Sequence, residues 1–409
     1  NRMGQQPLTD GQCQQAIDAY ALYGDARAAG KSLNLPENTF RNRIKEGRRR
    51  ELKISAGILD PTNVRHLLAQ VKELKADLKK AEATTLDHSV IKAEIIKLAS
   101  SVSNISTPAW ALTSKRGHDF PGVPSLMLSD LHWGEVVDLK QVNGVNEYNL
   151  RIARERLKEV GQSAIRLLTI LSPKLDYPGM VLILGGDLIN GNLREEMTAT
   201  NEENVMPVLV DLFEHISALI LTMAETFGKV FLPCVTGNHG RATHKMWAAD
   251  RHATSYEWLI YCLLAKHFAN DKRITFFIPD GTDAHYRVFN HRFVLTHGDA
   301  FRGGDGVIGP LGPIIRGDFK KRARNAQLNM DYDTMLLGHF HSYMHLTKLI
   351  VNGSLVGYNE YAYANNFPYE APCQALFLVH PKYGITYRMP VYAAKREIKA
   401  SLEWLSIAK

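Results

Sequence analysis

SLMLSDLHWGE, residues 125–135, is an apolar run that stops abruptly at a carboxylate and an imidazole. Leu126, Met127 and Leu128 have the character of a buried strand. Asp130 and His132 follow at once, and such groups are costly to bury unless they are paired or bind a metal. The stretch therefore predicts a buried strand whose carboxyl end presents two metal-binding side chains.

Outward from this stretch, the same pattern recurs along the chain. Short apolar runs end in Asp, Asn or His, and longer helical patterns at 149–171 and 204–228 lie between them. This alternation predicts an α/β or α+β sandwich with polar side chains gathered at the strand ends. The further runs are MVLILGGD (180–187), VFLPCVTGNH (230–239), RFVLTHGD (292–299), TMLLGHFH (334–341) and LIVNGS (349–354).

The polar residues at these strand ends form a set of ligand types. Several imidazoles with carboxylates and one amide oxygen suit borderline divalent ions such as Mn²⁺, Fe²⁺ or Zn²⁺. There are too many for one ion, so they predict two metals about 3.5–4 Å apart that share a carboxylate. The candidates are Asp130, His132, Asp187, Asn238, His239, His297, His339 and His341.

In this order, D-x-H (130–132), G-G-D (185–187), G-N-H (237–239), an isolated His297 and G-H-x-H (338–341) resemble the signature of the calcineurin-like metallophosphoesterases. The resemblance covers about residues 124–391. It implies an α+β fold, a two-sheet β-sandwich flanked by helices, and two divalent cations. Mn²⁺ is the first choice for these ions, and Fe²⁺, Zn²⁺ and Mg²⁺ are alternatives.

The resemblance also implies roles for individual residues. His239 would steady the phosphoryl group or protonate the leaving oxygen, and Asp187 would bridge the two metals. Metal one would be held by Asp130, His132, Asp187 and His341. Metal two would be held by Asp187, Asn238, His297 and His339.

Two departures from the family pattern bear on these roles. The family usually has an acid after G-N-H, whereas Gly240 and Arg241 follow here, so His239 needs another partner or is tuned by Arg241. The protein phosphatases of the family carry an Arg that GGDLINGN (185–192) lacks, which argues against that branch. Asn190 and Asn192 are expected near the site without an assigned role.

Residues 9–50 read as short helices. DARAAGKSLNLPENTFRNRIKEG (25–47) resembles a helix-turn-helix module, with 37–46 as the recognition helix and Pro36 at its first position. The pattern predicts an all-α DNA-binding domain over 1–60; the alternative is a small helical bundle with a solvated basic face. The candidate nucleic-acid contacts are Arg41, Arg43, Lys45, Arg48, Arg49 and Arg50.

A charged helical stretch follows over 61–107. Apolar residues at heptad positions within 62–83 predict either a short coiled coil that pairs two chains or an amphipathic connector. The phosphoesterase domain is expected over 108–409.

Composition limits the cell compartment and the partners. Lys and Arg number 49 against 42 Asp and Glu, and this modest net charge of +7 favours an anionic partner without requiring one. The four cysteines are scattered and predict reduced thiols in a cytosol. The resemblance of the whole architecture to phosphoesterases of tailed phages implies that this is the cytosol of a bacterium or of a phage-infected host. Neither a membrane span nor a secretion signal is expected from the apolar patterning.

Two more segments bear on the substrate. RGDFKKRARN (316–325) is basic and would place Lys320, Lys321, Arg322 and Arg324 against a polyanion, unless it is only a solvated helix. GYNEYAYANNFPYE (357–370) could stack bases or simply pack on the edge of the sandwich.

The SbcD-type DNA-repair nucleases share the motif order, and the whole architecture looks like phosphoesterases of tailed phages. The sequence thus predicts a metal-dependent DNA endo- or exonuclease held on DNA by its N-terminal helices. The alternatives are a small-nucleotide phosphodiesterase or phosphatase, and a DNA-binding regulator with a degenerate phosphoesterase domain.

Overall fold

The computed structural model describes residues 8–53, 107–113, 121–193, 195–243, 245–303 and 309–394. The chain divides into two compact units, residues 1–93 and 94–409. The predicted domain limits at 60 and 107 remain predictions. The heptad segment 62–83 lies outside the described residues.

In the described part of the first unit, three helices pack on one another: α1 (Asp10–Tyr23), α2 (Ala26–Ser32) and α3 (Glu37–Arg49). Thr9 begins α1 with a capping box, and Asp25 caps α2 by accepting a bond from the Ala28 N–H. Phe40 and Ile44, one turn apart on α3, are buried against alanines of α1 and α2. Phe40 and Ile44 therefore form the buried face of α3.

Two details of α3 differ from the sequence prediction. Pro36 is the N-cap and not the first helical residue, since its backbone is extended. The helix also continues through Gly47 to Arg49, past the predicted end of the recognition helix at residue 46, because a single glycine weakens a helix without ending it.

The second unit contains two mixed sheets. The first has the strand order β11-β10-β1-β2-β3-β4, and β1 to β4 are parallel. The second has the order β5-β6-β7-β9-β8, and β6, β7 and β9 are parallel. The strands are β1 (Val123–Leu128), β2 (Met180–Leu184), β3 (Val230–Pro233), β4 (Ile274–Phe277), β5 (Asp283–Val288), β6 (His291–Thr296), β7 (Thr334–Leu337), β8 (Met344–Leu346), β9 (Leu349–Val351), β10 (Cys373–His380) and β11 (Gly384–Tyr392).

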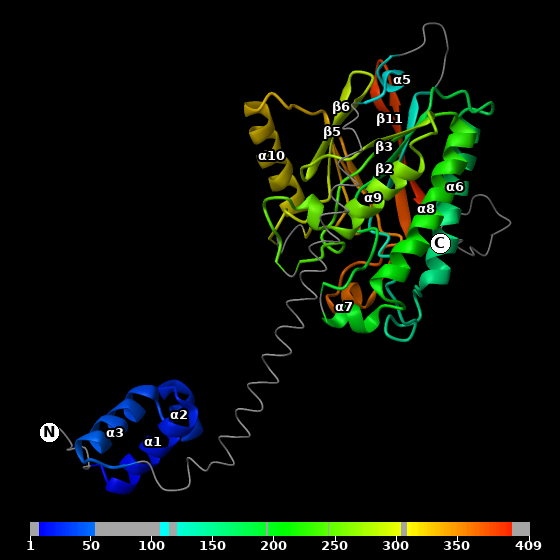
Figure 1. Ribbon diagram of the computed structural model, residues 1–409. Coiled ribbons are helices and arrows are strands. Elements are labelled where there is room, and N and C mark those ends of the chain that lie inside the picture. Colours follow the sequence, from blue (N-terminus) through cyan, green and yellow to red (C-terminus); the bar gives the residue numbers. More distant parts are fainter. Residues whose placement is uncertain are drawn as a thin grey trace, which may run out of the picture. The chain divides into compact units, whose positions relative to one another are not determined.

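The two sheets pack face to face, and helices cover both outer faces (Figure 1). One cluster of buried side chains, including Met127, Phe231 and Phe293, joins the two sheets. A second cluster lies between the first sheet and α6 (Leu150–Leu171), α8 (Val205–Phe227) and α9 (Tyr256–His267). A third, smaller cluster packs α10 (Leu311–Gln327) on the second sheet.

This layering explains why the strand sequences are continuously apolar. Leu182 and Leu184 of β2 join the helix-side cluster, whereas Val181 and Ile183 join the cluster between the sheets. Successive side chains of a strand point to opposite faces, so a strand that is covered on both faces must be apolar at every position.

The helix α8 is long and apolar enough to cross a membrane by length and composition alone. It is the one such helix in the described part of the chain. Leu212, Ile216 and Ile220 on one of its faces pack in the helix-side core. Its hydrophobicity is thus that of a helix covering a sheet.

The predicted two-sheet sandwich flanked by helices is confirmed, with both sheets containing runs of parallel strands. The six predicted strands are observed as β1, β2, β3, β6, β7 and β9, and the two predicted helices as α6 and α8. Shorter elements complete the described chain: α5 (Ala109–Leu112), α7 (Glu195–Thr200), a 3₁₀ turn at His252–Thr254 and α11 (Glu360–Ala364).

Candidate metal centre

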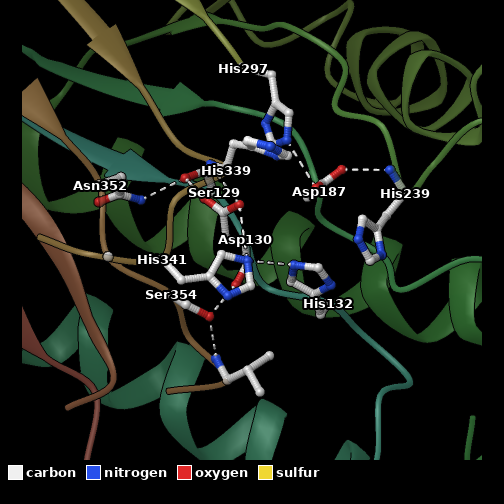
Figure 2. Close-up of polar contacts among 12 residues, drawn as sticks. Ser129, Asp130, His132, Asp187, His239, His297, His339, His341, Asn352 and Ser354 are labelled. Carbon is white, nitrogen blue, oxygen red and sulfur yellow. Dashed lines mark hydrogen bonds and ion pairs between the residues drawn. The ribbon is translucent and has the colours of Figure 1, made fainter. Parts of the chain in front are cut away.

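The predicted ligands follow the carboxyl ends of parallel strands in both sheets, and these ends meet at one edge of the sandwich (Figure 2). Asp130 and His132 follow β1, and Asp187 follows β2. Three overlapping groups can each hold a metal ion, since the donor atoms within each group lie within 4.8 Å of one another. They are Asp130, His132 and His341; His132, Asp187 and His239; and Asp187, His297 and His339.

The first group forms one half of the centre. The Nε2 atoms of His132 and His341 lie 3.0 Å apart, and Nε2 of His341 lies 3.5 Å from Oδ1 of Asp130. Lone pairs on two neutral imidazoles repel when they face each other this closely. A cation between them removes that repulsion, so the geometry suits a metal ligand set.

The second group forms the other half. Nε2 of His297 lies 2.9 Å from Oδ2 of Asp187, and Nδ1 of His297 donates to the Gly185 carbonyl at 2.9 Å. The Gly185 bond fixes the tautomer that leaves Nε2 facing the centre. The ring of His339 lies 5.2 Å from that of His297.

Asn238 supplies a separate sign of a missing ligand. Its Oδ1 atom is buried and has no hydrogen-bond partner among the described residues. Such orphaned atoms are costly, and a cation would satisfy this one. The donor set of imidazoles, carboxylates and one amide oxygen therefore fits divalent metal ions, as the sequence predicted.

The protonation states of two imidazoles fit the same interpretation, whereas Asp130 and His297 would have to lose a proton to bind a metal. Burial raises the pKa of Asp130 to about 7. Burial opposes protonation of His297, but the adjacent Asp187 carboxylate outweighs it and raises the pKa of His297 to about 10. Burial and neighbouring imidazoles lower the pKa of His341 to about 3 and that of His339 to about 4. His339 and His341 are thus neutral at pH 7, the form in which imidazole binds a metal.

The backbone is strained where it presents these side chains. Left-handed φ angles, from 45° to 69°, occur at Asp130, His132, Asp187, His339 and His341. Non-glycine residues adopt such angles rarely, at a cost of about 1–3 kcal/mol each, and they cluster at functional sites. The tight loops turn each side chain back over the strand ends.

Glycine is required where the loops pass the two carboxylates. A Cβ atom at Gly237 would collide with the Asp187 carboxylate, and one at Gly338 would collide with that of Asp130. This close approach explains the glycines that precede Asn238 and His339.

A buried polar network behind Asp130 was not predicted from the sequence. Ser129 donates to Oδ2 of Asp130, and Asn352 donates to Ser129 at 2.9 Å (Figure 2). Gln374 accepts from the Ser129 N–H at 3.0 Å and from Asn352 at 2.9 Å. The network orients the Asp130 carboxylate; the only sequence signal was the polar end of the run 349–354.

Glu257 is a second residue that the sequence did not reveal. It is fully buried on α9, and it accepts bonds of 2.6 Å from the N–H groups of Leu188 and Gly237. Burial, with a contribution from Asp187, raises its pKa to about 8. One carboxylate thus joins the loop after Asp187 to the loop before Asn238.

Glu257 also explains why position 240 is a glycine. A Cβ atom at Gly240 would lie 2.5 Å from Cγ of Glu257. The carboxylate delivered by α9 therefore occupies the space next to position 240.

His239 has its partner in Asn190. Its Nδ1 lies 3.1 Å from the Asn190 carbonyl and 3.2 Å from Oδ1 of Asn190. The carbonyl can only accept, so Nδ1 donates and Nε2 faces away. Arg241 instead directs Nε to the Thr243 carbonyl at 2.7 Å.

Asn190 and Glu135 also hold His132. Its Nδ1 lies 3.3 Å from Oδ1 of Asn190 and 3.4 Å from Oε2 of Glu135. Asn190 is itself fixed by Asn201, whose Oδ1 it contacts at 2.8 Å. Outer partners of this kind set the tautomer and orientation of ligating imidazoles.

The basic segment on α10 does not present all its charges to solvent. Lys321 is nearly buried and pairs with Asp283 at 2.6 Å, and Arg324 pairs with the same carboxylate at 2.9 Å. Arg322 pairs with Asp318 at 2.8 Å, and Lys320 is exposed. The sequence predicted that these residues contact a polyanion, with a solvated helix as the alternative. In the structure, the pairs of Lys321 and Arg324 with Asp283 hold the helix on the second sheet.

The basic residues on and just after α3 also divide into those that form ion pairs and those that are exposed without one among the described residues. Arg41 pairs with Glu37 at 2.7 Å, and Glu46 receives Arg49 and Arg50 at 2.9 Å each. Arg43 is partly buried, whereas Lys45 and Arg48 are exposed. The predicted nucleic-acid contacts on α3 and α10 stay predictions.

Comparison with family models and with curated proteins gave no match. Among solved structures, the chain is similar to a conserved uncharacterized protein, a predicted phosphoesterase, from Streptococcus pneumoniae TIGR4, with 10% identity, 66% of this chain and 99% of that chain covered, and a TM-score of 0.24. It is also similar to a Vps29 single mutant from Entamoeba histolytica, with 13% identity, 66% and 99% coverage, and a TM-score of 0.25. A third similar structure is Vacuolar Protein Sorting 29 from Cryptosporidium parvum, with 10% identity, 66% of this chain and 100% of that chain covered, and a TM-score of 0.24. At TM-scores this low, neither fold nor activity is taken from these proteins.

Proposed function

We propose that the second unit is a phosphoester hydrolase that uses two divalent metal ions. The observation that carries the proposal is the meeting of three donor groups from two sheets around Asp187, with Asn238 Oδ1 left unpaired among the described residues. When bound, two ions at such a site stabilise charge on a phosphoryl group and provide an activated water.

The residues of the chain would divide the work as follows. Asp130, His132 and His341 would hold one ion, and Asn238, His297 and His339 the other. Asp187 shares one donor group with His132, a ligand of the first ion, and another with His297 and His339, ligands of the second, so it would bridge the two ions.

His239 would act on the substrate itself. Its Nδ1–H is used by the Asn190 carbonyl, so its Nε2 would steady a phosphoryl oxygen or carry the proton for the leaving oxygen. General acid assistance of this kind contributes about 10²–10⁴-fold to a rate.

For the substrate we propose DNA, with the enzyme acting as an endo- or exonuclease. The support is the excess of cations and the basic face of α3, where Arg41, Lys45 and Arg48 line a pocket of about 370 Å³. Mn²⁺ is the proposed metal because the donor set mixes imidazole with oxygen. The alternative substrate is a small nucleotide ester, for which the basic helices have no role.

The test is hydrolysis by the purified full-length protein with added Mn²⁺. Supercoiled, linear and single-stranded DNA are compared with bis-(p-nitrophenyl) phosphate at several salt concentrations. Turnover of both substrate classes is expected. Turnover of the small diester alone favours the nucleotide alternative, and turnover of neither contradicts the proposed activity.

A further inference from the structure

The loop 358–369, named here the aromatic loop, carries an unusual surface. Tyr361 is 64% exposed, Tyr363 47%, Phe367 50% and Tyr369 54%. Four large rings half-exposed within nine residues are a concentrated apolar patch, and such patches mark binding sites in soluble domains.

The rings are arranged against one another and not splayed into solvent. Tyr361 and Phe367 have centroids 5.9 Å apart, and Tyr358 lies 5.6 Å from Tyr369 and 6.4 Å from Tyr363. The Tyr358 hydroxyl donates to the Phe367 carbonyl at 2.9 Å and closes the loop. The surface is therefore preformed.

Two side-chain paths connect the aromatic loop to the metal centre. Asn359 donates to Oε1 of Glu135 at 2.8 Å, and Oε2 of Glu135 lies 3.4 Å from Nδ1 of His132. At its other end, Glu370 accepts a hydrogen bond from Ser342, which directly follows His341. The loop thus borders the two imidazoles whose Nε2 atoms face each other.

The base of the loop is held by a buried cation. Arg156 donates to the carbonyls of Leu355 and Val356 at 2.9 and 2.7 Å, and to Oδ1 of Asn146. Asn146 in turn donates to the Tyr358 carbonyl at 2.7 Å. A rigid base fixes the distance between the rings and the centre.

We propose that the aromatic loop is a stacking platform for unpaired bases of a single-stranded polynucleotide whose phosphodiester lies in the metal centre. This inference rests on the proposed hydrolase function and assigns its substrate class. Exposed ring faces stack any base, and in a duplex the base faces are covered by their neighbours. Glu360 on the loop accepts the Asp138 N–H at 2.8 Å. Recognition by stacking is sequence-tolerant, because every base has a π-face.

The test measures binding of the full-length protein to a fluorescein-labelled oligothymidylate without divalent metal, so that no turnover occurs. Tyr361→Ala combined with Phe367→Ala should weaken binding by about 5- to 150-fold per lost stack, while the ring-preserving pair Tyr361→Phe and Phe367→Tyr should bind like the parent. Tyr383→Ala is the matched control, because Tyr383 is 67% exposed in the turn after β10, whereas the aromatic loop lies before the other end of this strand. A blunt-ended duplex should bind all variants alike.

Single-strand affinity of the alanine pair within twofold of the parent overturns the platform, and the loop would then contact a protein partner. Hydrolysis of bis-(p-nitrophenyl) phosphate with Mn²⁺ separates the two proposals. If the parent hydrolyses the diester, the alanine pair should show a lower ratio of oligonucleotide to diester turnover, and an unchanged ratio overturns the platform alone. If the parent hydrolyses neither substrate, the proposed activity fails, and the metal-free binding result still decides the platform.

Discussion

Two imidazoles of the candidate centre are oriented by neighbours that bind their Nδ1 atoms. His297 uses Nδ1 on the Gly185 carbonyl, and His239 uses Nδ1 on Asn190. Asp187 receives the His239 N–H on Oδ1 at 2.7 Å. Because the Asp187 carboxylate makes several of these contacts, its loss should have the largest effect on metal binding and activity.

Asp187→Ala should remove one of two bound ions and lower diester hydrolysis by several orders of magnitude. The physical reason is that both proposed ions share this carboxylate, while the core around it is made by other residues. Metal analysis and a melting curve measure the effect, with Asp331→Ala as the control because Asp331 is exposed in the turn before β7. Two ions retained with normal turnover would show that another residue is the bridge.

Glu257 and Gly240 should be coupled. Glu257→Ala removes the bond that joins two ligand loops and should lower metal affinity or activity by about 10- to 100-fold. Gly240→Ala alone should also harm the site, because its methyl group would meet Cγ of Glu257 at 2.5 Å.

The decisive variant combines Glu257→Ala with Gly240→Asp, which places an acid at position 240, next to the space that the Glu257 side chain occupies in the parent. Gly240 has no left-handed φ, so a side chain is tolerated once Glu257 is shortened. The double variant should recover metal affinity over Glu257→Ala. No recovery, with the melting temperature restored, would mean that Glu257 supports the fold and not the ligand loops.

Metal binding should release protons to an extent that depends on pH. Without metal, the pKa of Asp130 is raised to about 7 and that of His297 to about 10, so both groups hold a proton at pH 6 and only His297 holds one at pH 8. Both must lose their protons to bind a metal, so affinity should rise from pH 6 to 8 and proton release should fall from about two to about one. Calorimetry in buffers of different ionisation enthalpy measures this, and pH-independent release would contradict it.

At the scale of elements, α10 shows how a basic segment can be structural. Its Lys321 reaches across to Asp283 on β5 and contacts both carboxylate oxygens, at 2.6 and 2.7 Å. Ile315 and Phe319 remain exposed on its outer side. The charges on its inner side therefore fasten the helix to the second sheet.

Adjacent lysines on α10 should behave differently. Lys321→Ala leaves Asp283 partly uncompensated and should lower the free energy of unfolding by about 3 kcal/mol, since breaking a buried pair is costly. Lys320→Ala is the matched control; it is exposed and should change stability by less than about 0.5 kcal/mol. Chemical denaturation compares them, and equal effects would contradict the structural role of Lys321.

At the scale of the whole molecule, DNA binding should depend more on exposed cations that form no ion pair among the described residues than on the net charge of +7. Lys45 and Arg48 of α3 are exposed, and Arg48 lies over the Tyr20 ring at 5.8 Å. If the first unit holds the enzyme on DNA, these two cations should displace counterions from phosphates.

Replacing Lys45 and Arg48 with Gln should flatten the salt dependence of duplex binding by about 0.9 in log–log slope for each lost phosphate contact. Hydrolysis of bis-(p-nitrophenyl) phosphate should stay close to that of the parent. Lys158→Gln with Lys174→Gln removes the same charge from exposed positions on and just after α6 and serves as the control. If both pairs change the slope equally, α3 is not a specific contact surface.

The sequence by itself determined six of the eleven described strands and the candidate ligands, because that information is local. Each ligand directly follows an apolar run. Gly237 and Gly338 are required because they approach the carboxylates of Asp187 and Asp130 closely, and each stands at the start of a short motif that the sequence shows. Burial on both faces makes a strand continuously apolar, so β1 and β2 could be read without knowledge of their partners.

Only the tertiary structure decided how the site is supported. Glu257 meets Leu188 and Gly237, Gln374 meets Ser129, and Lys321 meets Asp283 across tens to hundreds of residues of chain. Periodicity and composition report whether a segment prefers burial, but a buried acid on a helix or a lysine in a basic run looks the same whether its partner is water or a distant residue. Those roles arise from which elements the packing of two sheets brings together, and that is a property of the whole fold.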